Sequence, residues 1–356
     1  MDSDLSNARA PKRKSTSPST TQRSSKRSKS TGPYDRNFQQ NLIDGGVYPD
    51  RYTYPDGRTP PKPTNWGDIN RRLSRPRPSL SPSRFSDDAH EKFTQADADV
   101  AKEKQVTTSV IPVIEGDIGD AKCVSGGIPF TNLCALTVGQ LVPGNPDIYY
   151  GARPEQLDLR VRDKLSDRII PSTQDNLPMA PNFFLAAKGP DGSAAVAKRQ
   201  ACCDGALGAR GMLSLQSYGQ ENASHYTKAY TMSSIYHDGH LKLYTSHPTR
   251  STSPSRRPEY HMHLLRDFSM IDTAHTFRQG ATHYRNGRDW AKEQRDEAIR
   301  QANGRVNGNS AEPPAVDASV DRGSGLTNEA TADETQPSKV TEESRISLTE
   351  DSDTAT

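Results

Sequence analysis

The stretch Pro181-Asn-Phe-Phe-Leu-Ala-Ala-Lys-Gly-Pro190 decides the fold that we expect for this chain. Its continuous apolar run is typical of a strand that is buried on both faces, and we predict that strand over residues 182–188. The segment Asn145-Pro-Asp-Ile-Tyr-Tyr-Gly151 predicts a strand before it, and the small-residue run from Ser193 to about Ser217 predicts a helix after it. We expect these three elements to form the centre of an α/β fold.

Three glycines, Gly205, Gly208 and Gly211, lie inside the expected helix. Each costs about 1 kcal/mol relative to alanine in a helix interior. The same helix is rich in alanine, so its side chains add little width. We infer that the helix lies closely against the sheet, because close packing would offset the cost of the glycines.

Other segments add helices and strands around this centre. An Asp-Gly pair between two alternating runs is a hairpin signal. The expected elements are a helix from Asp87 to about Gln105, a strand over Val106–Glu115, a helix over Pro154–Ile170, a hairpin from Ala229 to Tyr244 turned at Asp238-Gly239, a polar loop over 246–258, a strand over Tyr260–Met270 and a charged helix from Phe277 to about Asn303. Residues 89–303 are therefore expected to form one α/β domain.

The segment 34–88 is rich in proline and aromatic residues. Proline at this density excludes a long helix or a central strand, whereas the aromatic rings favour burial. We expect an extended arm that wraps the domain and is anchored through Trp66, Leu80 and Phe85, with a short helix near Phe38–Ile43.

The two ends of the chain carry opposite charge. Residues 1–30 contain eight Lys/Arg and two acids, whereas residues 311–356 contain eleven acids and three bases. We expect the segments 1–33 and 304–356 to be disordered, because they hold too few apolar residues to form a core.

Two basic clusters lie in the N-terminal segment, Lys12-Arg13-Lys14 and Lys26-Arg27 with Lys29. Their separation predicts a bipartite nuclear-import signal, and with it a nuclear location and an import receptor as partner. The alternative is a solvated basic tail that binds nucleic acid or acidic partners weakly.

The composition also limits the class of protein. The chain contains no apolar run long enough to cross a membrane, and its Met1-Asp-Ser-Asp start does not match a secretory signal. Four cysteines without CxxC spacing indicate a reducing compartment.

The Pro-Asp strand, the strand that ends in Lys188 and Gly-Pro, and the helix after them resemble the core of the PD-(D/E)xK metal nucleases. The wider span from about Phe38 to Asn303, about three quarters of the chain, resembles a fungal family of uncharacterised domains. That second likeness is carried by Arg77–Phe85, Pro146–Gly151, Pro181–Gly192, Gln200–Arg210, Ala229-Tyr-Thr, Phe277–Gly280 and Arg285-Asn286. The fungal family implies no activity, whereas the nuclease likeness implies a restriction-endonuclease-like core.

The nuclease likeness also implies roles for particular residues. In such enzymes, acids on two neighbouring strands hold Mg²⁺, and a lysine two residues after the second acid orients or deprotonates water. Asp147 matches the first acid and Lys188 the lysine, while Gln200 resembles the glutamine of the QxxxY helix, with Asp204 where tyrosine is expected. The second acid is missing, because Ala186 occupies its position.

A methyl group cannot replace a metal-binding carboxylate, so we expect a degenerate site and little hydrolysis. Another acid could compensate, and the candidates are Glu103, Asp191 and Asp204. Glu103 is also the best second metal ligand beside Asp147, with Mg²⁺ as the cofactor if the chain is active. The literal motif Asp120-Ala-Lys122 lies in a Gly-rich turn and is discounted.

Two further groups of residues have chemical interpretations. His261 and His263 lie on one face of an expected strand, which is a zinc-ligand spacing, although a polar strand face is favoured because no third ligand is near in sequence. The basic residues of the last helix could contact phosphates, although their interleaved acids favour a solvated helix with i,i+4 pairs.

Three hypotheses for function follow. The first is a nuclear, degenerate nuclease-like protein that binds DNA or a protein. The second is an active Mg²⁺-dependent nuclease whose acid has moved. The third is an interaction scaffold that uses the arm and the tails and binds no nucleic acid.

Overall fold

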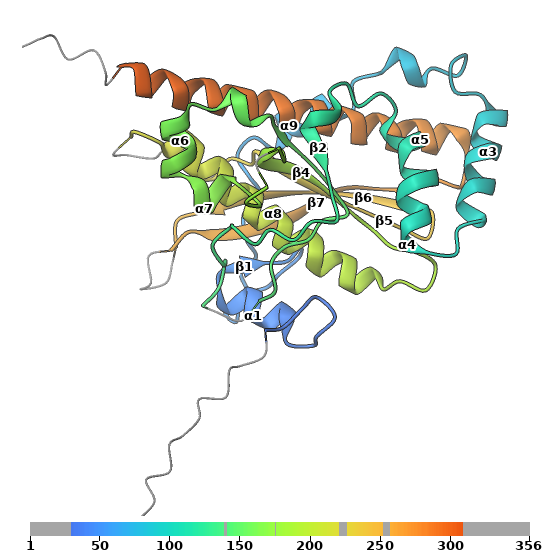
Figure 1. Ribbon diagram of the computed structural model, residues 1–356. Coiled ribbons are helices and arrows are strands. Elements are labelled where there is room, and N and C mark those ends of the chain that lie inside the picture. The colour runs from blue at the N-terminus through green and yellow to red at the C-terminus, as the bar shows by residue number, and fades with distance from the viewer. Residues whose placement is uncertain (1–29, 139–140, 175, 221–225, 252–256, 309–356) are drawn as a thin grey trace, which may run out of the picture. The chain divides into compact units, whose positions relative to one another are not determined.

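The computed structural model describes residues 30–138, 141–174, 176–220, 226–251 and 257–308 (Figure 1). The basic clusters that predict nuclear import, and the acidic tail from residue 309, lie outside the described residues. None of the described helices is long and apolar enough to cross a membrane.

A seven-stranded mixed sheet with the order β1-β7-β6-β5-β4-β3-β2 forms the centre of the protein. β4 and β5 are parallel, β5, β6 and β7 are antiparallel to one another in turn, and β3 is antiparallel to β4. The strands are β1 Val47–Tyr48, β2 Val124–Ser125, β3 Ile148–Ala152, β4 Met179–Ala187, β5 Thr231–His237, β6 His240–Thr249 and β7 Glu259–Ser269. The predicted α/β class is confirmed, as one mixed open sheet packed against helices.

Helices cover both faces of this sheet (Figure 1). One face packs against α3, α5 and α9, and the other packs against α8 and α1. The α-helices are α1 Phe38–Asp44, α2 Trp66–Leu73, α3 Asp87–Ala98, α4 Glu103–Gln105, α5 Ile111–Glu115, α6 Leu159–Lys164, α7 Ser166–Ile169, α8 Ala194–Ser217 and α9 Ala274–Gly308. The short 3₁₀ turns are Pro78–Leu80, Ala121–Cys123 and Pro154–Gln156, and a π-helical turn spans Val106–Val110.

The central prediction is confirmed. Every residue of β4 is buried, because the strand lies inside the sheet and both of its faces are covered. Gly205 and Gly208 of α8 lie against the sheet, and a Cβ added at Gly208 would be 2.6 Å from a ring carbon of Phe184. Gly211 instead faces α7, with an added Cβ 3.0 Å from the Arg168 carbonyl oxygen. The hairpin turn at Asp238 and Gly239 is also present, with φ of 52° and 68°.

The expected strand over Val106–Glu115 is wrong. This segment is helical, and its buried residues Val106, Val110, Ile111 and Ile114 recur at a helical period, with steps of four, one and three positions. Its many β-branched residues suggested a strand. Packing of the apolar face against the sheet outweighed that preference, and Pro112 is tolerated near the start of α5, where its missing N–H removes no helical hydrogen bond.

Four other boundaries differ from expectation. The helix expected from Asp87 to about Gln105 is divided into α3 and the short α4. α9 continues to Gly308, so the first residues of the segment 304–356, which was expected to be disordered, are helical. The helix expected over Pro154–Ile170 is divided into a 3₁₀ turn, α6 and α7. β6 continues to Thr249, so the first residues of the expected loop 246–258 are part of the sheet. In the arm, α1 matches the expected short helix, and Leu80 and Phe85 are buried as anchors while Trp66 is partly buried.

Candidate functional site

The antiparallel pairing of β3 and β4 brings Asp147 and Lys188 to the same end of the sheet. Ile148 is paired with Leu185, so Asp147, one residue before β3, falls opposite Ala186. The Asp147 amide donates to the Leu185 carbonyl at 3.1 Å, and the Ala187 amide donates to Asp147 Oδ2 at 2.8 Å. Asp147 is therefore fixed by the backbone of β4 next to the position where a second acid was expected.

Lys188 follows β4 and its side chain is 1% exposed. Its Nζ lies 2.9 Å from Glu103 Oε2 and 3.7 Å from Asp147 Oδ2, and it also donates to the Ala187 carbonyl at 2.7 Å. Glu103 reaches the lysine because it is the first residue of α4. The ammonium is thus enclosed by protein oxygens, and it is not positioned to orient a solvent water.

The acidity of Asp147 is strongly perturbed. Burial raises the pKa of its carboxyl to about 6, against the opposing effects of the Lys188 ammonium and the Ala187 amide. Part of this rise comes from the negative charge of Glu103, which shares the Lys188 ammonium with Asp147. A cleft carboxyl that titrates near neutral pH is typical of functional sites, although buried ion-pair networks produce the same shift.

Ala186 occupies a position that has little spare room. It is buried in the same apolar cluster as Ala197 and Ala201 of α8. The close approach of α8 to the sheet therefore places helix atoms over Ala186. Ala186 therefore places a methyl group where the nuclease pattern has an acid. The close packing of α8 is compatible with this small side chain.

The other expected site residues differ in their surroundings. Asp204 is buried, its Oδ1 has no hydrogen-bond partner in the described part of the chain, and burial raises its pKa well above the ordinary value. Gln200 is half-buried on α8, and its Oε1 likewise has no partner there. Asp191 is exposed. Of the three candidate replacement acids, Glu103 is the one that contacts Lys188 directly.

These residues do not fit a Mg²⁺ site. Within the described ranges, no group of three or more His, Cys, Asp or Glu side chains is arranged to hold a metal ion. Asp147 and Glu103 instead share the buried ammonium of Lys188. A lysine in this position supplies the positive charge that a cation would otherwise provide.

A cavity of about 430 Å³ opens beside Lys188. It is lined by a hydrogen-bonded pair of polar residues that the sequence did not predict. Tyr236 of β5 donates to Asp97 of α3 at 2.7 Å, and both residues line the cavity together with Asp238. Burial raises the pKa of Asp97. No local sequence pattern predicts this contact, because residues 97 and 236 are distant in sequence and become neighbours only when the chain folds.

His261 and His263, the two histidines of the expected polar strand face, are buried. A third histidine, His247 of β6, lies 5.6 Å from His261 and 5.3 Å from His263 between ring centroids. The rings of His247 and His263 are stacked, with an interplanar angle of 24°. The cluster does not form a metal site in the part of the chain that is described.

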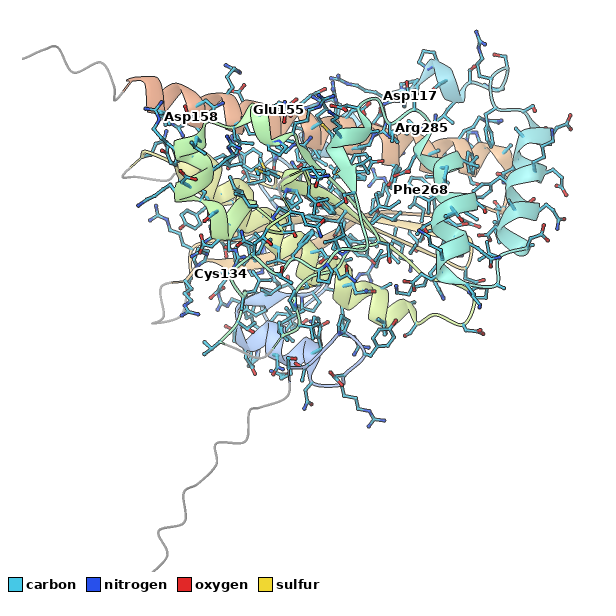
Figure 2. The ribbon with its side chains drawn as sticks, in the orientation of Figure 1. Asp117, Cys134, Glu155, Asp158, Phe268 and Arg285 are labelled. Atoms are coloured by element: carbon cyan, nitrogen blue, oxygen red, sulfur yellow. The ribbon has the colours of Figure 1, made fainter. Side chains whose placement is uncertain are left out.

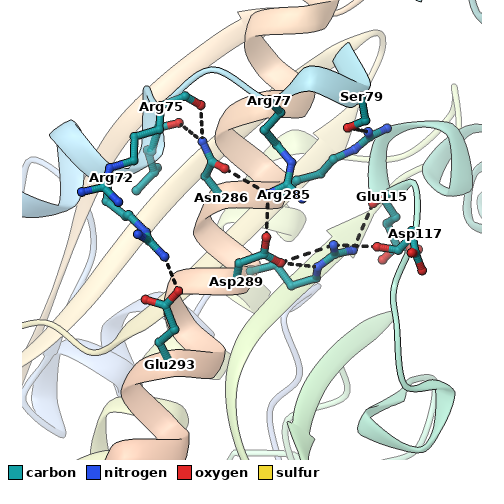
Figure 3. A network of polar contacts seen from close by, with 12 residues as sticks. Arg72, Arg75, Arg77, Ser79, Glu115, Asp117, Arg285, Asn286, Asp289 and Glu293 are labelled. Atoms are coloured by element: carbon teal, nitrogen blue, oxygen red, sulfur yellow. Dashed lines mark hydrogen bonds and ion pairs between the residues drawn. The ribbon is translucent and has the colours of Figure 1, made fainter. Parts of the chain in front are cut away.

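The charged helix α9 is less solvated than expected. Arg285, Arg288 and Arg295 are buried, so the expectation of an ordinary solvated face is wrong for them. Arg285 donates to the carbonyl oxygens of Val113 and Ile114, and Arg288 to those of Glu115 and Asp117, at 2.8 to 3.0 Å. Figure 3 labels Arg285, Glu115 and Asp117 of this network. One i,i+4 pair of the expected kind is present, between Lys292 and Asp296.

Comparison of this chain with protein-family models, with curated proteins and with solved structures gives no significant match.

Proposed function

We propose that this chain is a catalytically degenerate, nuclease-like protein of the nucleus that binds nucleic acid without cleaving it. The observation that carries the proposal is the pairing of Asp147 with Ala186, beside a lysine that is already held by Glu103 and Asp147. Two elements of a PD-(D/E)xK site are present in suitable positions, and the third is a methyl group.

The arrangement of the elements supports this restriction-endonuclease-like interpretation. β3 and β4 are antiparallel, α8 crosses from β4 to β5, and β4 and β5 are parallel. Ala186 packs with α8, and Asp147 lies opposite it across the pairing of β3 with β4. A carboxylate at position 186 would therefore lie beside Asp147, on the face of the sheet that α8 covers.

The test is restoration of the missing acid. Ala186→Glu is compared with wild type in a DNA cleavage assay with Mg²⁺ or Mn²⁺, and Ala186→Gln is the control of equal size without charge. We expect metal-dependent cleavage in Ala186→Glu alone, and its loss when Asp147→Asn is added. Circular dichroism and melting establish that each variant is folded, because residue 186 is buried. A folded Ala186→Glu that binds Mn²⁺ at the site without cutting would contradict the proposal.

The contact of Glu103 with the Lys188 ammonium, which Asp147 shares, favours one alternative. If Glu103 is the migrated acid, wild type itself should cleave DNA, and both Glu103→Gln and Asp147→Asn should abolish that cleavage. Arg84→Gln is a control on an exposed residue. The third hypothesis, a scaffold without nucleic acid, predicts that the chain shows no salt-sensitive DNA binding.

A further inference from the structure

A groove of about 880 Å³ lies at the C-terminal end of α8. α8 has 24 residues, and it contributes Ser214 and Ser217 of its last turn to the groove. Its walls come from α6, α7, the last turn of α8 and the end of α9. Asp158, labelled in Figure 2, immediately precedes α6, which forms one wall of the groove.

Four basic residues and one acid line the groove. Arg160, Lys164 and Arg168 follow one another at four-residue intervals, and four helical residues rise about 6 Å. Arg305 of α9 is the fourth base, and Asp167 is the acid. The groove therefore presents a row of cations on α6 and α7, together with one cation from α9.

The charges are only partly neutralised. Arg160 is bound by both carboxylate oxygens of Asp158 at 3.1 Å, and Arg168 pairs with Asp167 at 3.3 Å. For Lys164 and Arg305, no acidic partner lies within ion-pair distance among the described residues. Two positive charges thus remain available in the groove.

Arg305 is held in place by neutral groups. Its Nη1 donates to the carbonyls of Gln216 and Tyr218, at 3.0 Å in each case. These hydrogen bonds satisfy carbonyl oxygens at the C-terminal end of α8, which have no partner within the helix. They do not neutralise the positive charge of the guanidinium, because no carboxylate takes part. Ser217, in the same wall, has a buried hydroxyl oxygen without a hydrogen-bond partner in the described structure.

A buried arginine adds to the positive potential of this region. Arg210 of α8 is 5% exposed, and two of its guanidinium nitrogens have no hydrogen-bond partner within the described ranges. Burial lowers its pKa, and the positive charge of nearby Arg168 lowers it further. The guanidinium groups of Arg210 and Arg168 are close enough to repel each other. An anion near Arg168 would therefore be attracted by both positive charges.

We propose that this groove binds the phosphodiester backbone of nucleic acid. Arginine, lysine and hydroxyl side chains are the groups that contact phosphates, and a row of evenly spaced cations suits a polymer with one charge per unit. No side-chain pattern here is suited to reading bases, so the binding is independent of sequence. The inference does not rest on the nuclease-like chemistry, because the groove lies at the opposite end of α8.

The test is DNA binding by the full chain with Lys164→Gln and Arg168→Gln combined. The matched control combines Arg84→Gln and Lys92→Gln, which removes the same charge from two exposed residues elsewhere. A short fluorescein-labelled duplex is titrated between about 50 and 200 mM salt. We expect the groove pair to weaken binding about tenfold and to reduce the salt slope by about 2, whereas the control changes neither.

To remove any contribution of the basic N-terminal segment to DNA binding, both pairs are repeated with alanine at Lys12, Arg13, Lys14, Lys26, Arg27 and Lys29. The difference between the two pairs should then increase. Equal weakening by both pairs would overturn the proposal, and so would displacement of the duplex by polyglutamate as readily as by unlabelled DNA, which would indicate an acidic-peptide site. The cleavage assay of Ala186→Glu reports on the other end of α8, so the two proposals can fail independently.

Discussion

A buried lysine is stable at the end of β4 because its charge is compensated from several directions. Glu103 and Asp147 supply two carboxylates, and the Ala187 carbonyl accepts a third contact. Removing one partner from such a cluster leaves a buried charge uncompensated, which is far more costly than replacing the charges by apolar groups. The acidity of Asp147 therefore reports directly on its two charged neighbours.

Substitution of these neighbours should shift the pKa of Asp147 in opposite directions. Lys188→Met removes the cation that opposes burial, so the pKa should rise from about 6 by about one unit. Glu103→Gln removes a negative charge, so the pKa should fall. Carboxyl ¹³C chemical shifts measured against pH check both changes, and Lys102→Met, at an exposed site, is the control. A shift of the same sign in both variants would contradict this geometry.

The sequence was sufficient to place Asp147, Ala186 and Lys188 at strand ends, because the apolar run and Gly-Pro mark where β4 stops. It was not sufficient to show that Lys188 is buried. That depends on Glu103, the first residue of α4, whose carboxylate contacts the Lys188 ammonium although the two residues are 85 apart in sequence.

At the scale of elements, the small residues of α8 allow the helix to lie close to the sheet. Side chains at Gly205 and Gly208 would collide with β4, β5 and β6: a Cβ at Gly205 would be 2.4 Å from Ser246 Oγ. Sequence predicted this close approach from the number of small residues. It could not indicate which strands are approached, because neither the pairing of β5 with β6 nor their register is encoded locally.

Glycine-to-alanine substitutions in two helices should therefore have opposite effects. In Gly208→Ala the new Cβ would lie 2.6 Å from the Phe184 ring, and overpacking should lower the free energy of unfolding by about 1–3 kcal/mol. In Gly304→Ala of α9 the new Cβ meets no atom within 4 Å. The higher helix propensity of alanine should therefore raise the free energy of unfolding by up to about 1 kcal/mol. Urea denaturation of both variants measures the difference. Equal effects would show that α8 can move away from the sheet.

At the scale of the whole molecule, the arm is integrated into the core along much of its length. Tyr48 stacks on His261 with ring centroids 5.0 Å apart, and Phe85 stacks on Phe277 of α9 at 4.2 Å. Between these points, Arg77 donates to Asp289 at 2.5 Å and to Asn286 at 3.0 Å (Figure 3). Aromatic composition predicted that the arm is anchored, but not the partners, which are up to about 200 residues away in sequence.

The histidine cluster beneath the arm makes stability depend on pH. Burial lowers the pKa of His247 to about 3 and that of His261 to about 4, with repulsion from neighbouring histidines as the second cause. Their stabilising contribution is complete above the unfolded value of about 6.5 and is lost as pH falls toward 4 and 3. Asp147 has the opposite sign: its raised pKa means that protonation below about 6 favours the folded state.

Replacing His247 separates these two contributions. Between pH 7 and 5 one histidine with this shift should cost about 2 kcal/mol of unfolding free energy, because the unfolded chain takes up a proton that the folded chain does not. His247→Gln should remove this decrease in unfolding free energy and leave the contribution of Asp147 unchanged. His240→Gln, at an exposed site on the same strand, should leave the decrease in place. Urea denaturation at both pH values measures each variant. An unchanged pH dependence in His247→Gln would mean that the imidazole is already protonated in the folded protein, which its burial against His261 and His263 opposes.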